Sequence, residues 1–201
     1  MEYLILGFFT GLSLILAIGA QNIFVIEQGL KKQHVFLVSL ICSISDLILI
    51  FLGIFLFHYF IQYFNSTIEL IFNILLIIFL LHFIYSKIKV YNSSVNFNSD
   101  TKDISKLNIS LKTLGFTYHN PPVYSETVFF LGNFSKNFLI NEKIIFGIGA
   151  SIASFLFFFL IGYLSKFLSQ YAQNQKVWKV INIFIITFMS VLTFYIFLEI
   201  I

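Results

Sequence analysis

The sequence predicts an all-α, polytopic membrane protein with six transmembrane helices arranged as two inverted three-helix repeats. Three observations support this prediction. The 201 residues are 59% hydrophobic and only 10% charged, which is too little charge to cover the exterior of a soluble domain. Apolar runs of about 20 residues, the length that crosses a bilayer, recur along the chain. Two of these runs are interrupted by polar residues at matching places in the two halves.

Six apolar segments are long enough to be spans, near residues 4–26, 36–60, 68–86, 109–132, 144–165 and 178–200. The first is expected to be a retained span rather than a signal peptide, because Glu2 stands where basic residues are usual and apolarity continues to Ile26. The fourth is the least regular of the six. A hydrophilic stretch rich in Asn, Ser, Lys and Asp separates the third and fourth segments, and its composition predicts a flexible loop.

An internal repeat divides the chain into residues 1–86 as a first three-helix repeat, 87–108 as a hydrophilic cytoplasmic loop and 109–201 as a second three-helix repeat. Constant offsets pair polar and small residues of the two halves. A shift of 109 residues pairs Ser45 with Ser154, Gly53 with Gly162 and Asn73 with Asn182, and a shift of 98 pairs Asn22 with Asn120. Because three spans per repeat is an odd number, the two halves are expected to be inserted in opposite orientations.

The distribution of lysine predicts the orientation in the membrane. Basic residues accumulate in cytoplasmic loops. With six spans, ten of the 12 basic residues, all of them lysine, lie on one side, and only Lys136 and Lys143 lie on the other. We therefore expect both termini to face away from the cytoplasm. A five-span chain would show a similar bias, so it is the internal repeat that favours six spans.

The paired interruptions of the first and fourth segments are predicted helix breaks. Gly19 marks the first break, and Pro121 and Pro122 mark the second. An exposed backbone group costs several kcal/mol in hydrocarbon, so a break is tolerated only where protein or a water-filled cavity surrounds it. Proline also supplies no amide hydrogen, which leaves nearby carbonyls without helical partners. Paired breaks in two halves are typical of a transporter's substrate site.

Two acids lie within or beside the predicted spans. Asp46 shares one helix face with Ser39, Ser43 and Gly53, and an acid at mid-membrane usually faces a cavity or a partner. It is a candidate partner for a cation or a group that changes protonation, and the alternative is a structural ion pair or a hydrogen bond to Ser43. Glu126 follows the proline break and is a second candidate, unless it lies at the membrane interface.

Polar side chains at the two breaks complete the candidate substrate site. Gln21, Asn22 and Asn120 carry amides that both donate and accept hydrogen bonds, so they can bind the carboxylate and amino groups of a substrate or cap orphan backbone groups. Tyr124 lies between the second break and its acid. His119 could relay protons, since its ordinary pKa is near 6.5, although a single histidine is more often structural.

At these residues the chain resembles the LysE family of amino-acid exporters, most closely its lysine and arginine exporter branch. The resemblance rests on residues 18–32 (Ile-Gly-Ala-Gln-Asn-Ile-Phe-Val-Ile-Glu-Gln-Gly-Leu-Lys-Lys), on 44–47 (Ile-Ser-Asp-Leu), and on Asn120-Pro121 followed by Tyr124 and the acid at 126. Segments 153–155 and 177–182 are also similar to family segments. Ala20 stands where the family has proline, and Glu126 replaces its aspartate.

The resemblance implies export of a basic L-amino acid, lysine or arginine, across the bacterial cytoplasmic (inner) membrane, with inward proton flow as the driving force. Gln21, Asn22 and Asn120 would hold the substrate's backbone groups, while Asp46 and Glu126 would face its cationic side chain or carry a coupled proton. Export of neutral amino acids or other small solutes, as in sister branches, is the alternative.

A remote alternative is an intramembrane enzyme that uses Asp46 and Glu126 as an acid–base pair. No nucleophile, metal-ligand spacing or cofactor motif accompanies these acids, so we expect a protein that is not an enzyme and has no metal or cofactor. The lone Cys42 forms no disulfide framework, and no basic run suggests nucleic acid. Assembly into a homo-oligomer is left open.

Overall fold

The computed structural model describes residues 1–16, 20–63, 66–89, 105–120, 123–165 and 175–200. Within these ranges every regular element is a helix, which confirms the predicted all-α class. The helices are α1 (Glu2–Ile15), α2 (Ala20–Lys31), α3 (Val35–Phe60), η1 (Ile61–Tyr63), α4 (Ser66–Lys89), α5 (Lys106–Tyr118), η2 (Tyr124–Phe130), α7 (Leu131–Phe134), α8 (Ile140–Tyr163) and α10 (Gln175–Ile200). Here η1 is a 3₁₀ helix and η2 is a π-helix.

The first and fourth apolar segments are each divided into separate helices, as the sequence predicts. The first consists of α1 and α2, with the division after Ile15. The fourth consists of α5, which ends at Tyr118, and the η2–α7 segment, which begins at Tyr124. Gly19, Pro121 and Pro122, the predicted break residues themselves, lie outside the described residues.

The other four predicted segments each form one long helix. Within the described ranges, two helical stretches, Val35–Tyr63 and Ile140–Tyr163, are long and apolar enough to cross a membrane. Shorter apolar helical stretches occur at Glu2–Ile15, Leu70–His82 and Ile186–Leu198. The predicted loop at 87–108 is described only at its ends, where α4 continues to Lys89 and α5 begins at Lys106.

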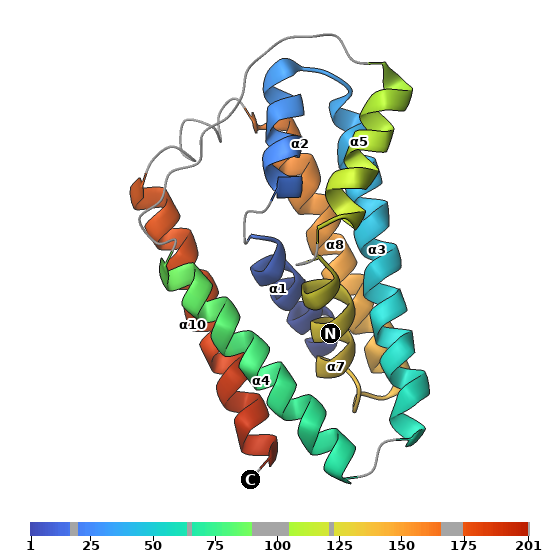
Figure 1. Ribbon diagram of the computed structural model, residues 1–201, viewed down its shortest axis with the longest axis vertical. Helices are drawn as coiled ribbons and strands as arrows, with labels where there is room; N and C mark the ends of the chain where they lie inside the picture. Colours follow the sequence, from blue (N-terminus) through green and yellow to red (C-terminus); the bar gives the residue numbers. More distant parts are fainter. Residues whose placement is uncertain (17–19, 64–65, 90–104, 121–122, 166–174, 201) are drawn as a thin grey trace.

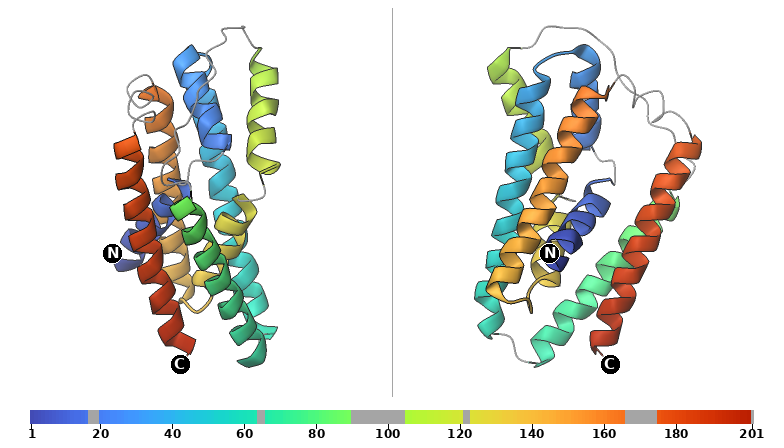
Figure 2. Two further views of the ribbon diagram at one scale, coloured as in Figure 1. Left: turned by 60° about the vertical axis from the view of Figure 1, so that its left-hand side comes forward. Right: turned by 180° about the vertical axis from the view of Figure 1, so that it is seen from behind.

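The helices run up and down in alternation (Figure 1). The chain rises through α1 and α2, descends through α3 and rises through α4; it then descends through α5, η2 and α7, rises through α8 and descends through α10. α3 packs against α8, and α4 packs against α10. Figure 2 shows α4 and α10 side by side, and the buried side chains of both helices join the core cluster that also contains residues of α3 and α8. Each divided segment crosses to the other half of the chain, with α1 along α8 and η2–α7 along α3.

Glycines allow these cross-half contacts to be close. A Cβ atom at Gly7 of α1 would collide with the backbone of Phe146, and one at Gly149 of α8 would collide with the backbone of Leu4. Gly53 of α3 meets the backbone of Val128 in the same way. Small residues at helix contacts are typical of membrane proteins, where close van der Waals packing holds helices together.

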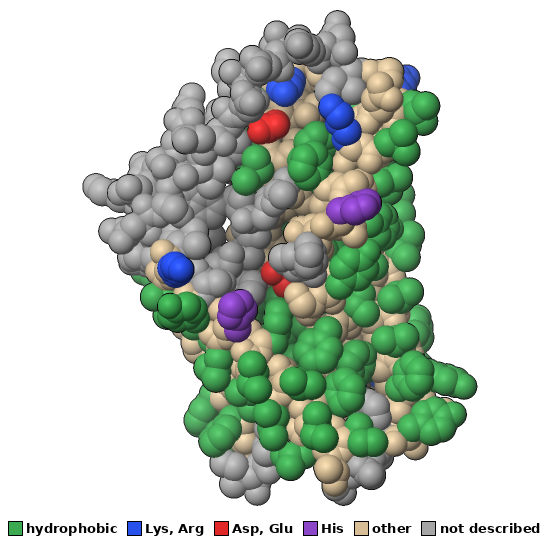
Figure 3. Space-filling model, in the orientation of Figure 1, with side chains coloured by type: hydrophobic (Ala, Val, Ile, Leu, Met, Phe, Trp, Pro, Cys, Tyr) green, Lys and Arg blue, Asp and Glu red, His purple; other side chains and the backbone are tan. Residues whose placement is uncertain are grey.

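Two apolar clusters form the core, one around Phe130 and Phe146 and the other around Phe24 and Phe158. Large apolar side chains also cover much of the exterior. Figure 3 shows them over the lower part and along the right-hand edge of one face, with lysine side chains in its upper part and at its left edge. A broad exposed apolar surface suits contact with lipid rather than water.

Candidate functional site

Asp46 lies near the middle of α3 and is held by α8. Its side chain is only 8% exposed, and Ser154 Oγ donates a hydrogen bond to Asp46 Oδ2 at 2.8 Å. The two residues are 108 positions apart, so the bond joins the two halves of the chain. The predicted face of α3 is confirmed, because Ser39, Ser43 and Gly53 are also buried. Ser39 Oγ donates to the Phe158 carbonyl of α8 at 3.1 Å, so a second hydrogen bond joins α3 to α8 at another level of the two helices.

Gln21 approaches this acid from the first turn of α2. Its side chain is 5% exposed and lies beside the Asp46 carboxylate and the Cys42 thiol. The Gln21 Nε2 atom is buried and donates no hydrogen bond to any residue that the structure describes. An unsatisfied buried donor costs roughly 1–3 kcal/mol, and this amide lies against the carboxylate of Asp46, whose negative charge it helps to stabilise.

Thr117 of α5 also lies beside Cys42, so four helices converge on one buried region. We call this region the central polar cluster, and its members are Gln21, Cys42, Asp46, Thr117 and Ser154. Three of its members were not predicted from the sequence as site residues: Cys42, Thr117 and Ser154. The sequence singles out Ser154 only as the repeat partner of Ser45, and Thr117 precedes the Asn120-Pro121 motif without being part of it. The polar face of α3 shows that Asp46 needs a partner, but it does not show which residue that partner is.

The structure gives Asn22 a capping contact at the first break. Asn22 Nδ2 donates to the carbonyl of Ile15, the last residue of α1, at 2.8 Å. The side chain of Asn22 is 4% exposed. A carbonyl at the end of a helix lacks an intrahelical partner. Of the two roles left open for this amide, capping is therefore the one that the geometry supports directly.

The second break is bridged by its own contacts. Tyr124 donates from its hydroxyl to the Tyr118 carbonyl at 2.9 Å, which joins the start of η2 to the end of α5. The Asn120 carbonyl accepts from the Val123 amide at 3.1 Å. His119 ends α5, its amide donating to the Gly115 carbonyl at 2.9 Å, and its side chain is exposed. The side chain of Tyr124 is exposed as well, so neither ring is enclosed in the central polar cluster.

Glu126 is half-buried in the π-helix η2. This segment packs along α3, where the backbone of Val128 touches Gly53. Gly53 follows Asp46 by seven residues, which is two helical turns or roughly 10 Å along the axis of α3. The segment that carries the second acid thus runs beside the helix that carries the first. Among the described residues, no group of three His, Cys, Asp or Glu side chains could hold a metal ion.

A buried polar cluster between divided, apolar helices defines the class of an integral membrane protein with an internal polar site. Solute transporters have sites of this kind between divided helices. The LysE type translocator family is the family whose model matches, over residues 12–199. The chain belongs to this family.

Curated relatives are similar over nearly the whole chain. The arginine exporter protein ArgO of Pectobacterium atrosepticum is 31% identical over 183 residues, which cover 89% of this chain and 88% of the relative. The arginine exporter protein ArgO of Salmonella typhimurium is 30% identical over 197 residues, covering 96% and 92% of the two chains. No solved structure matches the chain.

Proposed function

We propose that this chain exports arginine, and lysine as a second basic substrate, across the bacterial inner membrane. The support is threefold: membership of a translocator family, similarity to relatives named as arginine exporters, and an acid buried in the middle of the bundle. The single observation that carries the proposal is the environment of Asp46. A carboxylate held by Ser154 beside the unsatisfied amide of Gln21 suits a ligand with a cationic group and a hydrogen-bond acceptor.

Each part of the central polar cluster has a role in this proposal. Asp46 pairs with the guanidinium or ammonium group of the substrate side chain. Gln21 Nε2 donates to the substrate carboxylate or to a water that the substrate carries. A guanidinium presents several donors in a planar fork that matches a carboxylate, which favours arginine over lysine at such a site.

The residues of the second break serve the same substrate in a second conformation. Glu126 would receive the cationic side chain when Asp46 releases it, and Asn120 and Tyr124 would hold the backbone groups. Asn22 acts through the break that it caps, rather than by direct contact. His119 and the two acids are the candidates to carry protons, so that inward proton flow drives export.

Alternating access would follow from two inverted halves of three spans each. The alternating directions of the helices support this arrangement, as does the cross-half packing of both divided segments. The placement of lysines supports termini on the non-cytoplasmic side. On the predicted cytoplasmic side the exposed lysines include Lys32, Lys89, Lys106 and Lys112, whereas Lys136 and Lys143 on the opposite side are buried. The difference in exposed positive charge between the two sides is therefore greater than the count of lysines in the sequence suggests.

The proposal is tested by efflux. Cells are loaded with arginine-containing dipeptides, and release of free arginine is followed with and without the chain. Faster arginine release with the chain is expected, and equal release would refute the proposal. A competing panel of lysine and neutral amino acids separates the alternatives: competition by neutral amino acids alone would assign the chain to the export of neutral substrates.

A further inference from the structure

The central polar cluster divides the apolar core of the protein into two parts. We call the part around Phe24 and Phe158 the upper core and the part around Phe130 and Phe146 the lower core, after the places of α2 and α7 in Figure 1. On α3, Asp46 is four residues from Cys42 of the upper core and four from Ile50 of the lower core. Because four residues are about one helical turn, the acid marks the level at which α3 passes from one part of the core to the other.

The other helices follow the same boundary. On α8, Ser154 lies between Ala150 of the lower core and Phe157 of the upper core. Of the segments divided at the two breaks, α2 and α5 contribute buried apolar side chains to the upper core, while α1, η2 and α7 contribute them to the lower core. α2 ends at Lys31 and α5 begins at Lys106, so the upper core lies between the central polar cluster and the lysines of the predicted cytoplasmic side. A passage from that side to the cluster must therefore open through the upper core.

A stacked aromatic pair joins α2 to α5 on the upper side of the central polar cluster. The ring centroids of Phe24 and Phe116 lie 4.6 Å apart, with an interplanar angle of 28°. Phe24 is 6% exposed and follows Gln21 by three residues, so it lies on the same side of α2, about one turn closer to Lys31. Phe116 directly precedes Thr117 on α5. The two helices that carry Gln21 and Thr117 therefore meet ring to ring beside the cluster.

A separation of α2 from α5 would leave the contact that holds Asp46 in place. The two are short helices of 12 and 13 residues, each divided from the rest of its apolar segment. The contact between α3 and α8 is held independently of them, by the hydrogen bonds of Ser154 to Asp46 and of Ser39 to the Phe158 carbonyl. Movement of separate elements about fixed neighbours is a common way for a binding site to open and close.

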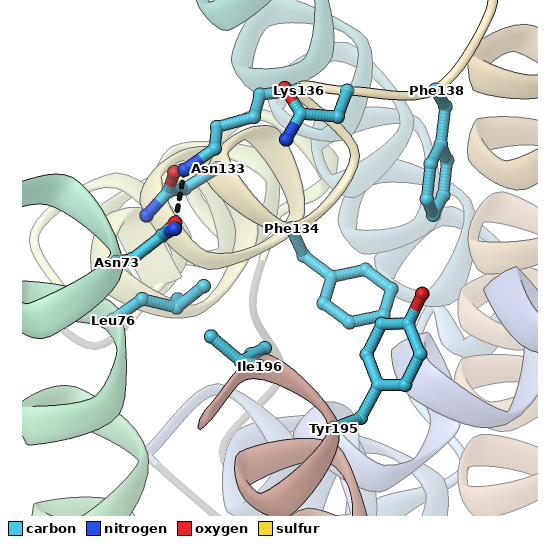
Figure 4. A pocket seen from close by; sticks show the side chains of 9 residues that line it. Asn73, Leu76, Asn133, Phe134, Lys136, Phe138, Tyr195 and Ile196 are labelled. Atoms are coloured by element: carbon cyan, nitrogen blue, oxygen red, sulfur yellow. Dashed lines mark hydrogen bonds between the residues drawn. The ribbon is translucent and has the colours of Figure 1, made fainter. Parts of the chain in front are cut away.

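The lower core is closed by more contacts. The ring centroid of Phe134 lies 5.8 Å from the centroids of Phe130 and Phe138 and 5.8 Å from that of Phe146. Figure 4 shows Phe134 beside side chains of α4 and α10, at the end of the molecule where Lys136 donates a hydrogen bond to Asn73. Three aromatic contacts and a polar contact hold this end together, so we expect the upper core to open more readily in this conformation.

We propose that α2 and α5 are the gate of the central polar cluster on the side of the exposed lysines, and that the stacked rings of Phe24 and Phe116 close it. In the structure this gate is shut, since Cys42 beside the acid is 0% exposed. Opening parts the two rings, and the substrate cation passes between aromatic faces, which attract guanidinium and ammonium groups. The choice of a cationic substrate rests on the proposed export function, whereas the position of the gate rests on the packing of α2 and α5.

Cys42 is the reporter for the test, because it is the only cysteine of the chain and belongs to the central polar cluster. The probe is a membrane-impermeant methanethiosulfonate with a quaternary ammonium group, which forms a disulfide with the thiol and releases methanesulfinate. It is added to the full-length protein in membrane vesicles of either orientation, so that each face is probed separately, and the rate of Cys42 modification is measured. A buried thiol reacts only in an open state, so the rate reports how often the gate opens.

Phe116→Leu removes one ring of the stacked pair and keeps an apolar side chain. From the face of the exposed lysines its modification rate is expected to rise about two- to tenfold, which is the loss of an aromatic pair expressed as a ratio of open to closed states. From the other face the rate is expected to stay at the wild-type level, and Phe24→Leu is expected to behave in the same way. Phe36→Leu is the matched control, because it removes an exposed ring that contacts Phe159 between α3 and α8, with centroids 5.7 Å apart. Its rates are expected to equal those of the wild type on both faces.

Wild-type rates for Phe116→Leu and Phe24→Leu on the face of the exposed lysines would overturn the proposal, because the rings would then not close the passage. A rise of the same size on both faces, or an equal rise in Phe36→Leu, would show a general loosening of the fold and would overturn it as well. In a separate arm, an excess of arginine is expected to slow modification of the wild type by occupying the cluster. Unchanged modification with arginine would count against the proposed substrate, while the phenylalanine variants still decide the gate, so the two proposals can fail separately.

Discussion

Replacing Asp46 with asparagine separates charge from shape at the central polar cluster. The two side chains are nearly isosteric, and the asparagine Oδ1 can accept the hydrogen bond that Ser154 Oγ now donates at 2.8 Å. The substitution therefore removes one negative charge while the contact between α3 and α8 stays in place. We expect Asp46→Asn to lose arginine efflux and to keep its fold.

The size of the loss follows from burial. At 8% exposure, Asp46 meets a cation across protein rather than bulk water. Opposite unit charges about 4 Å apart interact by about 4 kcal/mol at an effective dielectric constant near 20. Since about 1.4 kcal/mol corresponds to a factor of ten, efflux is expected to fall about 100- to 1000-fold. An exposed pair would contribute about 1 kcal/mol or less, so a fall below tenfold would indicate a solvated contact.

The assay is efflux of radiolabelled arginine from proteoliposomes, with a melting curve of each variant in detergent. Glu2→Gln is the matched control, because it removes one acid from an exposed position at the start of α1. Its efflux and melting temperature are expected to equal those of the wild type. Wild-type efflux by Asp46→Asn would refute the reasoning and leave Asp46 as a structural residue.

Three further predictions concern contacts that hold the site. Ser154→Ala is expected to lower the free energy of unfolding by about 0.5–1.5 kcal/mol, because it removes the hydrogen bond to Asp46. Ser151→Ala is expected to lower it by much less, because Ser151 Oγ donates within its own helix, to the Gly147 carbonyl at 2.8 Å. Equal melting temperatures of the two variants would contradict this. Gly53→Ala is expected to destabilise the fold by about 1–3 kcal/mol, because the added Cβ atom would collide with the backbone of η2. Gly115→Ala is the control, since a Cβ atom there would meet nothing within 4 Å, and it is expected to be neutral or stabilising in the same melting assay. Asn22→Ala is expected to cost about 1 kcal/mol by removing the hydrogen bond to the Ile15 carbonyl at the end of α1, and an unchanged melting temperature would show that this bond is dispensable.

The helices and their breaks could be predicted because both are local properties. Apolar length predicts a helix wherever backbone groups must bond within their own segment. Glycine, proline and amide side chains mark the places where this rule fails, and the structure divides the chain next to Gln21 and next to Asn120. The buried face of α3 could be predicted from the spacing of its polar residues around Asp46 for the same reason.

The partners of these residues could not be predicted, because they depend on tertiary packing. Ser154 meets Asp46 only because α3 and α8 cross at that level, 108 positions apart in the chain. Lys136 and Lys143 count as loop charge in the sequence, yet both side chains are buried, Lys136 against the amide of Asn73 and Lys143 against a backbone carbonyl and a histidine. An asparagine at position 22 looks the same in the sequence whether it caps a helix or binds a ligand. Only the position of the Ile15 carbonyl distinguishes these two roles.

The division of the first segment also has an electrostatic consequence. Aligned peptide dipoles give the end of α1 roughly half a negative charge and the start of α2 roughly half a positive charge. Gln21 lies in that first turn of α2, and its side chain lies beside the carboxylate of Asp46. Backbone dipoles cannot be titrated. The centre of this molecule therefore keeps fixed poles of both signs at every pH, whatever the protonation of the acids around it.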